Sequence, residues 1–316
     1  MRALITGGAG CIGSDLAAAL LERGDEVAVL DNFSSGRREH IEPLIRQPGF
    51  RLIEGDLLDA ATVERAVNGA EIVWHLAANP DVKFTPESPT DLDLKQNTLA
   101  TYNVLEAMRK AGVRRIAFAS TSAVYGIQER LPIPEDAPCR PISLYGAAKL
   151  AGEALISAFS HLFGIQAWIL RFANIVGPKV RKRGRTVIGD FIARLKENPQ
   201  ELLILGDGRQ RKSYLTAAEC IEAMLFVVDH AREPLNIYNL GGRDAVTVTR
   251  IAELVAEAMG LEGVRFRYTG GEGGWPGDVP RFTLDVTRLG RLGWRARLNS
   301  EESVREAIRQ LLERKP

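Results

Sequence analysis

The stretch that decides the fold lies near the start of the chain: Leu4-Ile5-Thr6-Gly7-Gly8-Ala9-Gly10-Cys11-Ile12-Gly13-Ser14. A short apolar strand runs into a glycine-rich turn, and residues 15–23 form a helix-forming segment directly after it. Gly8, Gly10 and Gly13 satisfy G-x-G-x-x-G, and Gly7, Gly10 and Gly13 satisfy G-x-x-G-x-x-G. A pyrophosphate approaches a backbone closely only where no Cβ intervenes, and a helix N-terminus offers it unpaired N–H groups. The stretch therefore predicts a dinucleotide-binding turn.

A carboxylate after the next strand supports this interpretation against a purely structural glycine turn. The predicted strand at residues 26–30 ends at Asp31, which follows Gly13 by 18 residues. This spacing is close to that of the carboxylate that binds an adenosine ribose. Such a carboxylate accepts a hydrogen bond from the ribose 2′-hydroxyl and repels a 2′-phosphate, so we expect NAD rather than NADP. Arg37 and Arg38 could meet a 2′-phosphate, but we interpret them as part of a solvated loop.

Composition narrows the class of protein. The chain has 316 residues, 45% of them hydrophobic, which suits one large α/β domain or one and a half. A net charge of +1 gives no overall attraction to nucleic acid or to an anionic membrane. Three separated cysteines and four histidines favour neither a disulfide framework nor a bound metal. Since the first strand begins almost at Met1 and no apolar run reaches membrane-spanning length, we expect a cytoplasmic protein.

The predicted elements alternate between strand and helix up to about residue 174, which is typical of a doubly wound parallel sheet of the Rossmann class. The predicted strand 71–77 ends in small residues, which leave space for a ligand. We interpret His75 in this strand as a packed residue bonded to backbone. A single long helix is predicted over residues 92–110.

The alternation ends after residue 178, where a basic run at residues 179–185 is interpreted as a solvated loop. We assign residues 1–174 and 213–243 to a nucleotide-binding domain. Residues 175–212 and 244–316 are predicted to form a smaller, interleaved lobe that closes over the strand ends.

Tyr145 and Lys149 are the candidate catalytic pair, because a spacing of four at the start of a helix places them on one face. A tyrosine has a reference pKa of about 10, but a neighbouring ammonium favours its phenolate. The pair suits proton removal from an alcohol while hydride leaves the same carbon. The hydroxyls of residues 120–122, at the end of a predicted strand, could relay or share that proton.

Together these motifs resemble the extended short-chain dehydrogenase/reductases of the nucleotide-sugar epimerase and dehydratase family, and within it the UDP-glucose 4-epimerases. The matching segments are Thr6–Ser14, Asp31-Asn32, Gly55-Asp56-Leu57, His75-Leu76-Ala77-Ala78, Asn97, Val124-Tyr125-Gly126, Tyr145/Lys149, Arg171-Phe172-Ala173-Asn174, Gly206-Asp207-Gly208 and Gly277-Asp278. The resemblance covers nearly the whole chain. It implies NAD as the cofactor, a UDP-sugar as the substrate and a homodimer, since helices 92–110 and 145–161 have apolar positions on more than one face.

The resemblance also implies roles for individual residues. Thr121 takes the place of the catalytic Ser/Thr, Tyr145 that of the base, and Lys149 binds the nicotinamide ribose and tunes Tyr145. The residues expected to bind NAD are Gly7, Gly10, Cys11, Ile12, Gly13, Asp31, Asn32, Ser35, Gly36, Asp56, Leu57, Leu76, Ala77, Ala78, Asn97, Ser120, Tyr145, Lys149 and Phe172. Those expected to bind the substrate are Thr121, Ser122, Asn174, Val187, Arg211, Lys212, Asp278 and Phe282.

Two departures from the family pattern bear on the reaction and the substrate. Similar 4,6-dehydratases carry Asp-Glu before the Val-Tyr-Gly step, and similar decarboxylases a Glu, where this chain has Ser122 and Ala123. This implies 4-epimerisation of UDP-glucose and UDP-galactose through a 4-keto sugar. Trp275 stands where many members have an arginine for the UDP pyrophosphate, so Arg211, Lys212 or Arg281 is expected to supply that charge.

Three alternatives remain open. The chain could epimerise a UDP-N-acetylhexosamine or a UDP-uronate. It could be another NAD-dependent dehydratase or reductase acting on a nucleotide sugar. A non-catalytic NAD-sensing protein of the same fold is the third alternative, although such proteins typically lose the Tyr/Lys pair that this chain retains.

Overall fold

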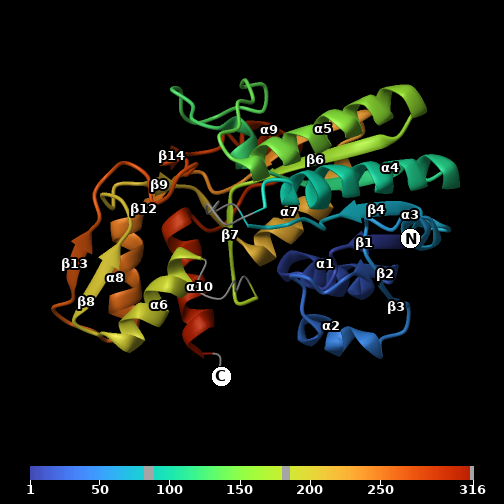
Figure 1. Cartoon of the computed structure of the whole chain (residues 1–316). Coiled ribbons are helices and arrows are strands. Elements are labelled where there is room, and N and C mark those ends of the chain that lie inside the picture. Colours follow the sequence, from blue (N-terminus) through green and yellow to red (C-terminus); the bar gives the residue numbers. More distant parts are fainter. Residues whose placement is uncertain (82–88, 180–185, 314–316) are drawn as a thin grey trace.

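Seven parallel strands form the large sheet of the protein, in the order β11-β6-β5-β4-β1-β2-β3 (Figure 1). They are β1 (Arg2–Thr6), β2 (Glu26–Asp31), β3 (Phe50–Glu54), β4 (Ile72–His75), β5 (Arg115–Thr121), β6 (Gln166–Phe172) and β11 (Leu235–Leu240). The computed structural model describes residues 1–81, 89–179 and 186–313. The parallel order confirms the predicted doubly wound α/β class.

Helices cover both faces of this sheet, which explains why its central strands read as continuous apolar runs. One face is covered by α1 (Cys11–Glu22), α2 (Arg38–Ile45) and α7 (Ala217–His230). The other is covered by α3 (Ala60–Val67), α4 (Ala100–Ala111) and α5 (Leu144–Phe163). In β6 every residue from Ala167 to Phe172 is buried. Within the described ranges, no helix combines the length and the apolar character needed to cross a membrane.

The strand order reverses at β1, which lies between β2 and β4. The chain first builds the sheet outward through β2 and β3, then crosses back to β4 and continues in the opposite direction. Loops that follow strands on the two sides of such a reversal diverge and leave a crevice at the carboxyl ends of the strands. This crevice is where the glycine-rich turn of the first strand lies.

The second part of the chain lies beside the large sheet, on the left in Figure 1. Its strands are β7 (Asn174–Val176), β8 (Glu201–Ile204), β9 (Arg211–Lys212), β10 (Tyr214–Thr216), β12 (Val246–Thr247), β13 (Arg265–Tyr268) and β14 (Arg281–Phe282). The helices α6 (Val187–Glu197), α8 (Val248–Ala258) and α10 (Ser300–Glu313) share a core of their own with β7, β8, β10, β12 and β13. In contrast, α9 (Thr287–Leu292), which the predicted boundaries place in the lobe, packs against β11 and α7.

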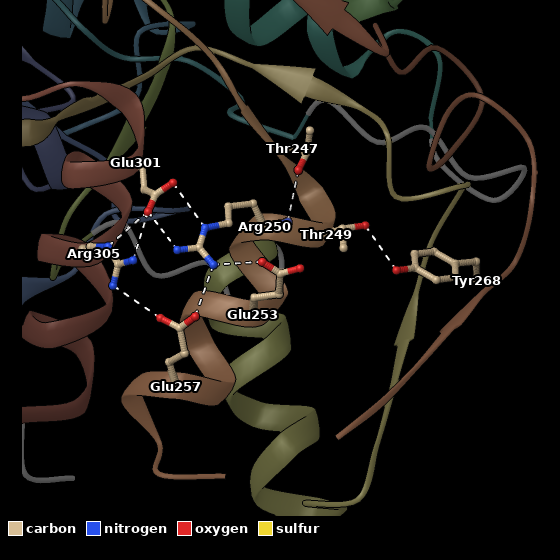
Figure 2. A network of polar contacts seen from close by, with 8 residues as sticks. All are labelled: Thr247, Thr249, Arg250, Glu253, Glu257, Tyr268, Glu301 and Arg305. Carbon is tan, nitrogen blue, oxygen red and sulfur yellow. Dashed lines mark hydrogen bonds and ion pairs between the residues drawn. The ribbon is translucent and has the colours of Figure 1, made fainter. Parts of the chain in front are cut away.

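An ion-pair network joins two helices of this second part (Figure 2). Arg250 on α8 pairs with Glu253 and Glu257 of its own helix and, through two nitrogens, with Glu301 on α10. Arg305 on α10 contacts both Glu301 and Glu257. The arginines are thus each shared between the two helices, so the network favours one alignment of α10 along α8.

The basic run at residues 179–185 is described only at its first residue. Lys179 forms an ion pair with Asp15 on α1 and donates to the Ser14 hydroxyl at 3.1 Å. The interpretation as a solvated residue was therefore wrong for Lys179. Residues 180–185 lie outside the described residues.

Candidate active site

A cavity of about 380 Å³ lies at the carboxyl ends of the strands, beside the glycine-rich turn; we call it the cofactor cavity. The residues expected to bind NAD that line it are Gly7, Gly10, Cys11, Ile12, Gly13, Asp31, Asn32, Ser35, Gly36, Asp56, Leu57, Leu76, Ala77, Ala78, Ser120, Tyr145, Lys149 and Phe172. The carboxyl ends of β1 to β6, with the loops that follow them and the start of α5, thus meet at the cofactor cavity. Of the residues expected to bind NAD, Asn97 alone does not line the cofactor cavity.

The glycine-rich turn packs closely against neighbouring backbone while it lines the cofactor cavity. Gly7 has φ +71, and a Cβ on it would lie 2.7 Å from the backbone of Ala77. A Cβ on Gly13 would lie 2.4 Å from the carbonyl oxygen of Gly7. Helix α1 begins at Cys11 with no side-chain cap and no acidic residue in its first turn. Glycine is therefore required here by close backbone packing, and the start of α1 keeps the N–H donors that a pyrophosphate needs.

Asp31 ends β2 at the edge of the cofactor cavity. Its carboxylate accepts hydrogen bonds from the backbone N–H groups of Ala9 at 2.9 Å and Phe33 at 2.8 Å. Burial raises the pKa of Asp31, and these two hydrogen bonds oppose the rise. The carboxylate thus links the glycine-rich turn to the loop after β2 while it faces the cavity.

The two arginines after Asp31 are engaged elsewhere. Arg38 forms an ion pair with Glu54, and its guanidinium lies 4.3 Å from the centre of the Phe33 ring. Arg37 lines the cofactor cavity but pairs with Glu39 at 2.9 Å. Neither guanidinium is therefore held ready for a 2′-phosphate by this loop.

Asn97 is displaced from the cavity because the helix that carries it is not regular. The helix predicted over residues 92–110 is present without a break, but within it a π-helix, η1 (Leu94–Leu99), precedes α4. Its wider turn changes which side chains share a face. Gln96 lines the cavity instead, while the Asn97 side chain accepts from Asn79 N at 2.7 Å and donates to Asp93 at 2.9 Å. Asn97 thus shapes the loop beside the cavity.

Tyr145 and Lys149 lie in the first two turns of α5, whose start is capped by Ser143. The Lys149 ammonium is buried and donates to the carbonyl oxygen of Ala119 at 2.8 Å. Burial lowers the pKa of Lys149 to about 7, and the carboxylates of Glu153 and Asp93 oppose this. Desolvation raises the pKa of Tyr145 to about 12, opposed by a hydrogen bond with Thr121.

A second cavity of about 320 Å³ adjoins the first, and both are lined by Pro80, Ile175 and Thr186. The expected substrate-binding residues that line it are Thr121, Ser122, Asn174, Val187, Lys212, Asp278 and Phe282. Thr121 faces the second cavity while its hydrogen-bond partner Tyr145 faces the cofactor cavity. The candidate base therefore stands at the junction of the two cavities.

Of the two neighbouring cations expected in the substrate site, Lys212 lines the second cavity and Arg211 does not. The two are neighbours in β9, so their side chains point to opposite faces. Arg211 is exposed and donates to the carbonyl oxygen of Ala245 at 3.1 Å, which overturns its expected place in the substrate site. Lys212 forms an ion pair with Asp278, and its ammonium lies 4.9 Å from the centre of the Trp275 ring.

Several lining residues were missed by the sequence analysis. They include His40, Gln96 and Thr186 in the cofactor cavity and Asp190, Arg194 and Tyr214 in the second. No local motif marks them, because each is brought to its cavity by the packing of separate elements. The π-helical register is what exposes Gln96 in place of its neighbour.

His75 lines neither cavity. It is buried, as predicted, but its partners are the hydroxyls of Thr6 at 2.7 Å and Thr101 at 2.9 Å rather than backbone groups. Burial, helped by the charge of Lys149, lowers the pKa of His75 to about 3. His75 is therefore a neutral packing residue at the end of β4.

Comparison with known proteins agrees with this geometry. Residues 3–241 match the model of the NAD dependent epimerase/dehydratase family. A UDP-glucose 4-epimerase of Corynebacterium glutamicum is 32% identical over 82% of this chain and 81% of its own length.

Solved structures are similar over nearly the whole chain. A crystal structure of a UDP-galactose 4-epimerase is 41% identical, covers 99% of both chains and has a TM-score of 0.87. The NAD complex of the Thermus thermophilus UDP-glucose 4-epimerase is 34% identical, with the same coverage and a TM-score of 0.86. The chain is therefore a member of the NAD dependent epimerase/dehydratase family, and NAD is its cofactor.

Proposed function

We propose that this protein is a UDP-glucose 4-epimerase, which interconverts UDP-glucose and UDP-galactose. The observation that carries the proposal is that Thr121 lines the second cavity while Tyr145 lines the adjoining cofactor cavity. A sugar bound where the two cavities meet can place one hydroxyl next to Tyr145, the proton acceptor. The carbon that carries this hydroxyl then faces the cofactor cavity. The relatives described above, which carry epimerase names, support the same reaction class.

In the proposed reaction Tyr145 accepts the proton of the hydroxyl on carbon 4, and Thr121 orients that hydroxyl. Lys149 supplies the positive charge that favours the Tyr145 phenolate. When NAD is bound, the chemistry that it supplies is hydride acceptance and hydride return at one carbon. Tyr145 gives its proton back to the 4-keto sugar after the sugar has turned over, so the enzyme ends in its starting state.

The side chains next to Thr121 favour epimerisation over dehydration. Ser122 and Ala123 follow Thr121 on the wall of the second cavity. An elimination needs an acid and a base beside the carbons that lose water, and Ala123 can serve as neither. Epimerisation needs only the proton exchange that Tyr145 provides.

The second cavity also suits the nucleotide. Lys212 is a cation on its wall, held between Asp278 and the Trp275 ring. We assign to it the diphosphate, and to Asn174 and Val187 the uridine. A substrate held by its nucleotide can rotate its sugar without leaving the site. Epimerisation requires this rotation, because hydride leaves one face of carbon 4 and returns to the opposite face.

The direct test is incubation of the purified protein with UDP-galactose and no added cofactor. We expect UDP-glucose to form, and NAD to be found in the protein after denaturation. UDP-N-acetylgalactosamine, UDP-glucuronate and dTDP-glucose are assayed in parallel. Release of a 4-keto-6-deoxy sugar, or turnover of only the acetylated or acidic sugars, would contradict the proposal.

Phe282 is predicted to exclude an acetamido group from the second cavity. It lies in β14, is 6% exposed, and packs with Tyr125, Ile133 and Leu284. This packing makes the ring a rigid wall. We expect kcat/KM to be at least about 10-fold higher for UDP-galactose than for UDP-N-acetylgalactosamine, since a steric mismatch costs about 1–3 kcal/mol.

Phe282→Ser is expected to raise kcat/KM for the acetylated sugar and to narrow this ratio. Because the variant also removes a buried ring, its melting temperature is measured, and Phe282→Leu serves as the control that keeps a hydrophobic wall. Equal kcat/KM values for the two sugars in the wild-type protein would rule out the steric argument.

We further propose that the protein is a homodimer built on the α4–α5 face. Side chains on η1, α4 and α5 leave apolar surface exposed: Leu94 (60%), Leu99, Tyr102, Leu162 (68%) and Phe163. Exposed apolar side chains on adjacent helices suit an interface between two copies of the chain, related by a two-fold axis. Light scattering at micromolar concentration is expected to give twice the chain mass. Leu99→Glu with Tyr102→Glu is expected to give monomers, and a wild-type monomer would contradict the proposal.

A further inference from the structure

Glu153 continues the column of side chains that Tyr145 and Lys149 begin on α5, with each residue four positions after the last. It is buried and lines neither cavity. The carboxylate accepts a hydrogen bond from the Ser120 hydroxyl at the end of β5. Ser120 therefore directs its proton toward Glu153 rather than toward either cavity.

The Glu153 carboxylate is also fixed from the other side, by Arg171 of β6. The guanidinium donates to Glu153 through Nε at 3.0 Å and through its terminal nitrogen at 2.7 Å, a bidentate geometry. The same guanidinium donates to the Tyr125 hydroxyl at 2.9 Å, and Tyr125 donates to Asn239 at 2.7 Å. The position of the negative charge is thus set by β5, β6 and β11 together.

The titratable groups that interact with Lys149 are Glu153 on α5, Asp93 just before η1 and His75 on β4. Arg171 of β6 is paired with Glu153. His75 is neutral near pH 7, and Asp93 accepts hydrogen bonds from the amides of Asn79 and Asn97. Glu153 is the larger of the two carboxylate influences on Lys149.

We propose that Glu153 is a positioning residue that keeps the shared proton of the Tyr145–Lys149 pair on Lys149. The inference deepens the proposed function, on which it rests. When the pair has lost one proton, the remaining one can lie on the phenol or on the amine. Only the second arrangement contains the phenolate that removes the hydroxyl proton. A fixed carboxylate four residues beyond Lys149 favours the ammonium and therefore the phenolate.

Glu153→Gln removes the charge and keeps the shape of the side chain. Deprotonation of Lys149 then becomes easier by about one pH unit, as expected for the loss of a nearby opposite charge. In the variant, the Tyr145–Lys149 pair loses its first proton at lower pH than in the wild-type protein. Lys149, rather than Tyr145, gives up that proton more often than before. In a plot of kcat against pH, we therefore expect the rise on the acid side (the acid limb) to shift to lower pH by about one unit. The maximal kcat reached above this rise (the plateau) is expected to fall by up to about 10-fold.

Two further variants separate charge from folding. Glu153→Asp keeps the charge but shortens the reach to Ser120 and Arg171, so it is expected to lower the melting temperature and to keep the acid limb near its wild-type pH. Glu219→Gln removes another buried carboxylate, which lies on α7 and accepts from the backbone of Arg297 at 2.7 Å. It is expected to lower the melting temperature without moving the acid limb.

The second readout needs no turnover. The phenolate absorbance of Tyr145 is obtained as the difference between each protein and its matching Tyr145→Phe variant, titrated with pH in the NAD-bound protein without sugar. Glu153→Gln is expected to lower the phenolate signal on the plateau. An unchanged acid limb and phenolate signal in a folded Glu153→Gln protein would overturn the inference. If no nucleotide sugar turns over, the proposed function fails, and the titration still decides the role of Glu153.

Discussion

Replacing Tyr145 by Phe is expected to lower kcat by about 10²–10⁴-fold, the usual contribution of a positioned general base. The phenyl ring keeps its packing at the start of α5, so the walls of both cavities remain in place. The variant loses only the hydroxyl, with its hydrogen bond to Thr121. Dissociation constants for NAD and UDP-glucose are therefore expected to change by less than about threefold, measured by calorimetry beside the steady-state assay.

Tyr268→Phe is the matched control, because this tyrosine is exposed in β13, its hydroxyl contacts Thr249 (Figure 2), and neither residue lines either of the two cavities. It is expected to keep the wild-type kcat. If Tyr145→Phe also turns over at the wild-type rate, another group must accept the proton. Loss of NAD binding in Tyr145→Phe would instead mean that the hydroxyl serves the cofactor rather than the proton transfer.

The combined change Asp31→Ala and Asn32→Arg is expected to shift the preference for NAD over NADP by about 100-fold or more. The first change removes the acceptor for the ribose 2′-hydroxyl and its repulsion of a phosphate, and the second adds a cation at the same edge. A hydrogen bond to a charged group contributes about 1.5–3 kcal/mol, which is roughly 10–100-fold in affinity. The new arginine must supply the phosphate contact, since Arg37 and Arg38 are already ion-paired.

Dissociation constants for both cofactors, measured by calorimetry, check this prediction. Because Asp31 also holds the N–H groups of Ala9 and Phe33, some affinity for both cofactors is expected to be lost with the turn geometry. Asp31→Asn is the control that keeps an acceptor without the charge. An unchanged ratio of the two constants in the double variant would show that Asp31 does not contact the ribose.

Local patterns in the sequence determined the fold class and most of the cofactor cavity. The glycine turn, Asp31 after β2 and the small residues after β4 all lie at strand ends, and parallel strands bring their carboxyl ends to one edge. The spacing of Tyr145 and Lys149 likewise determines that they share a face of α5. These features depend on backbone geometry over a few neighbouring residues, so a local sequence pattern is enough to predict them.

Only the tertiary structure decided which neighbours face the cavities. Gln96 replaces Asn97 because a π-helix changes the register, and Lys212 faces the second cavity because β9 pairs with β12 and β14 and leaves Arg211 outside. The ion pair of Glu153 with Arg171 joins α5 to β6, and neither local spacing nor composition records such a contact. Long-range packing sets the direction of these side chains, so they could not be assigned until the elements were placed together.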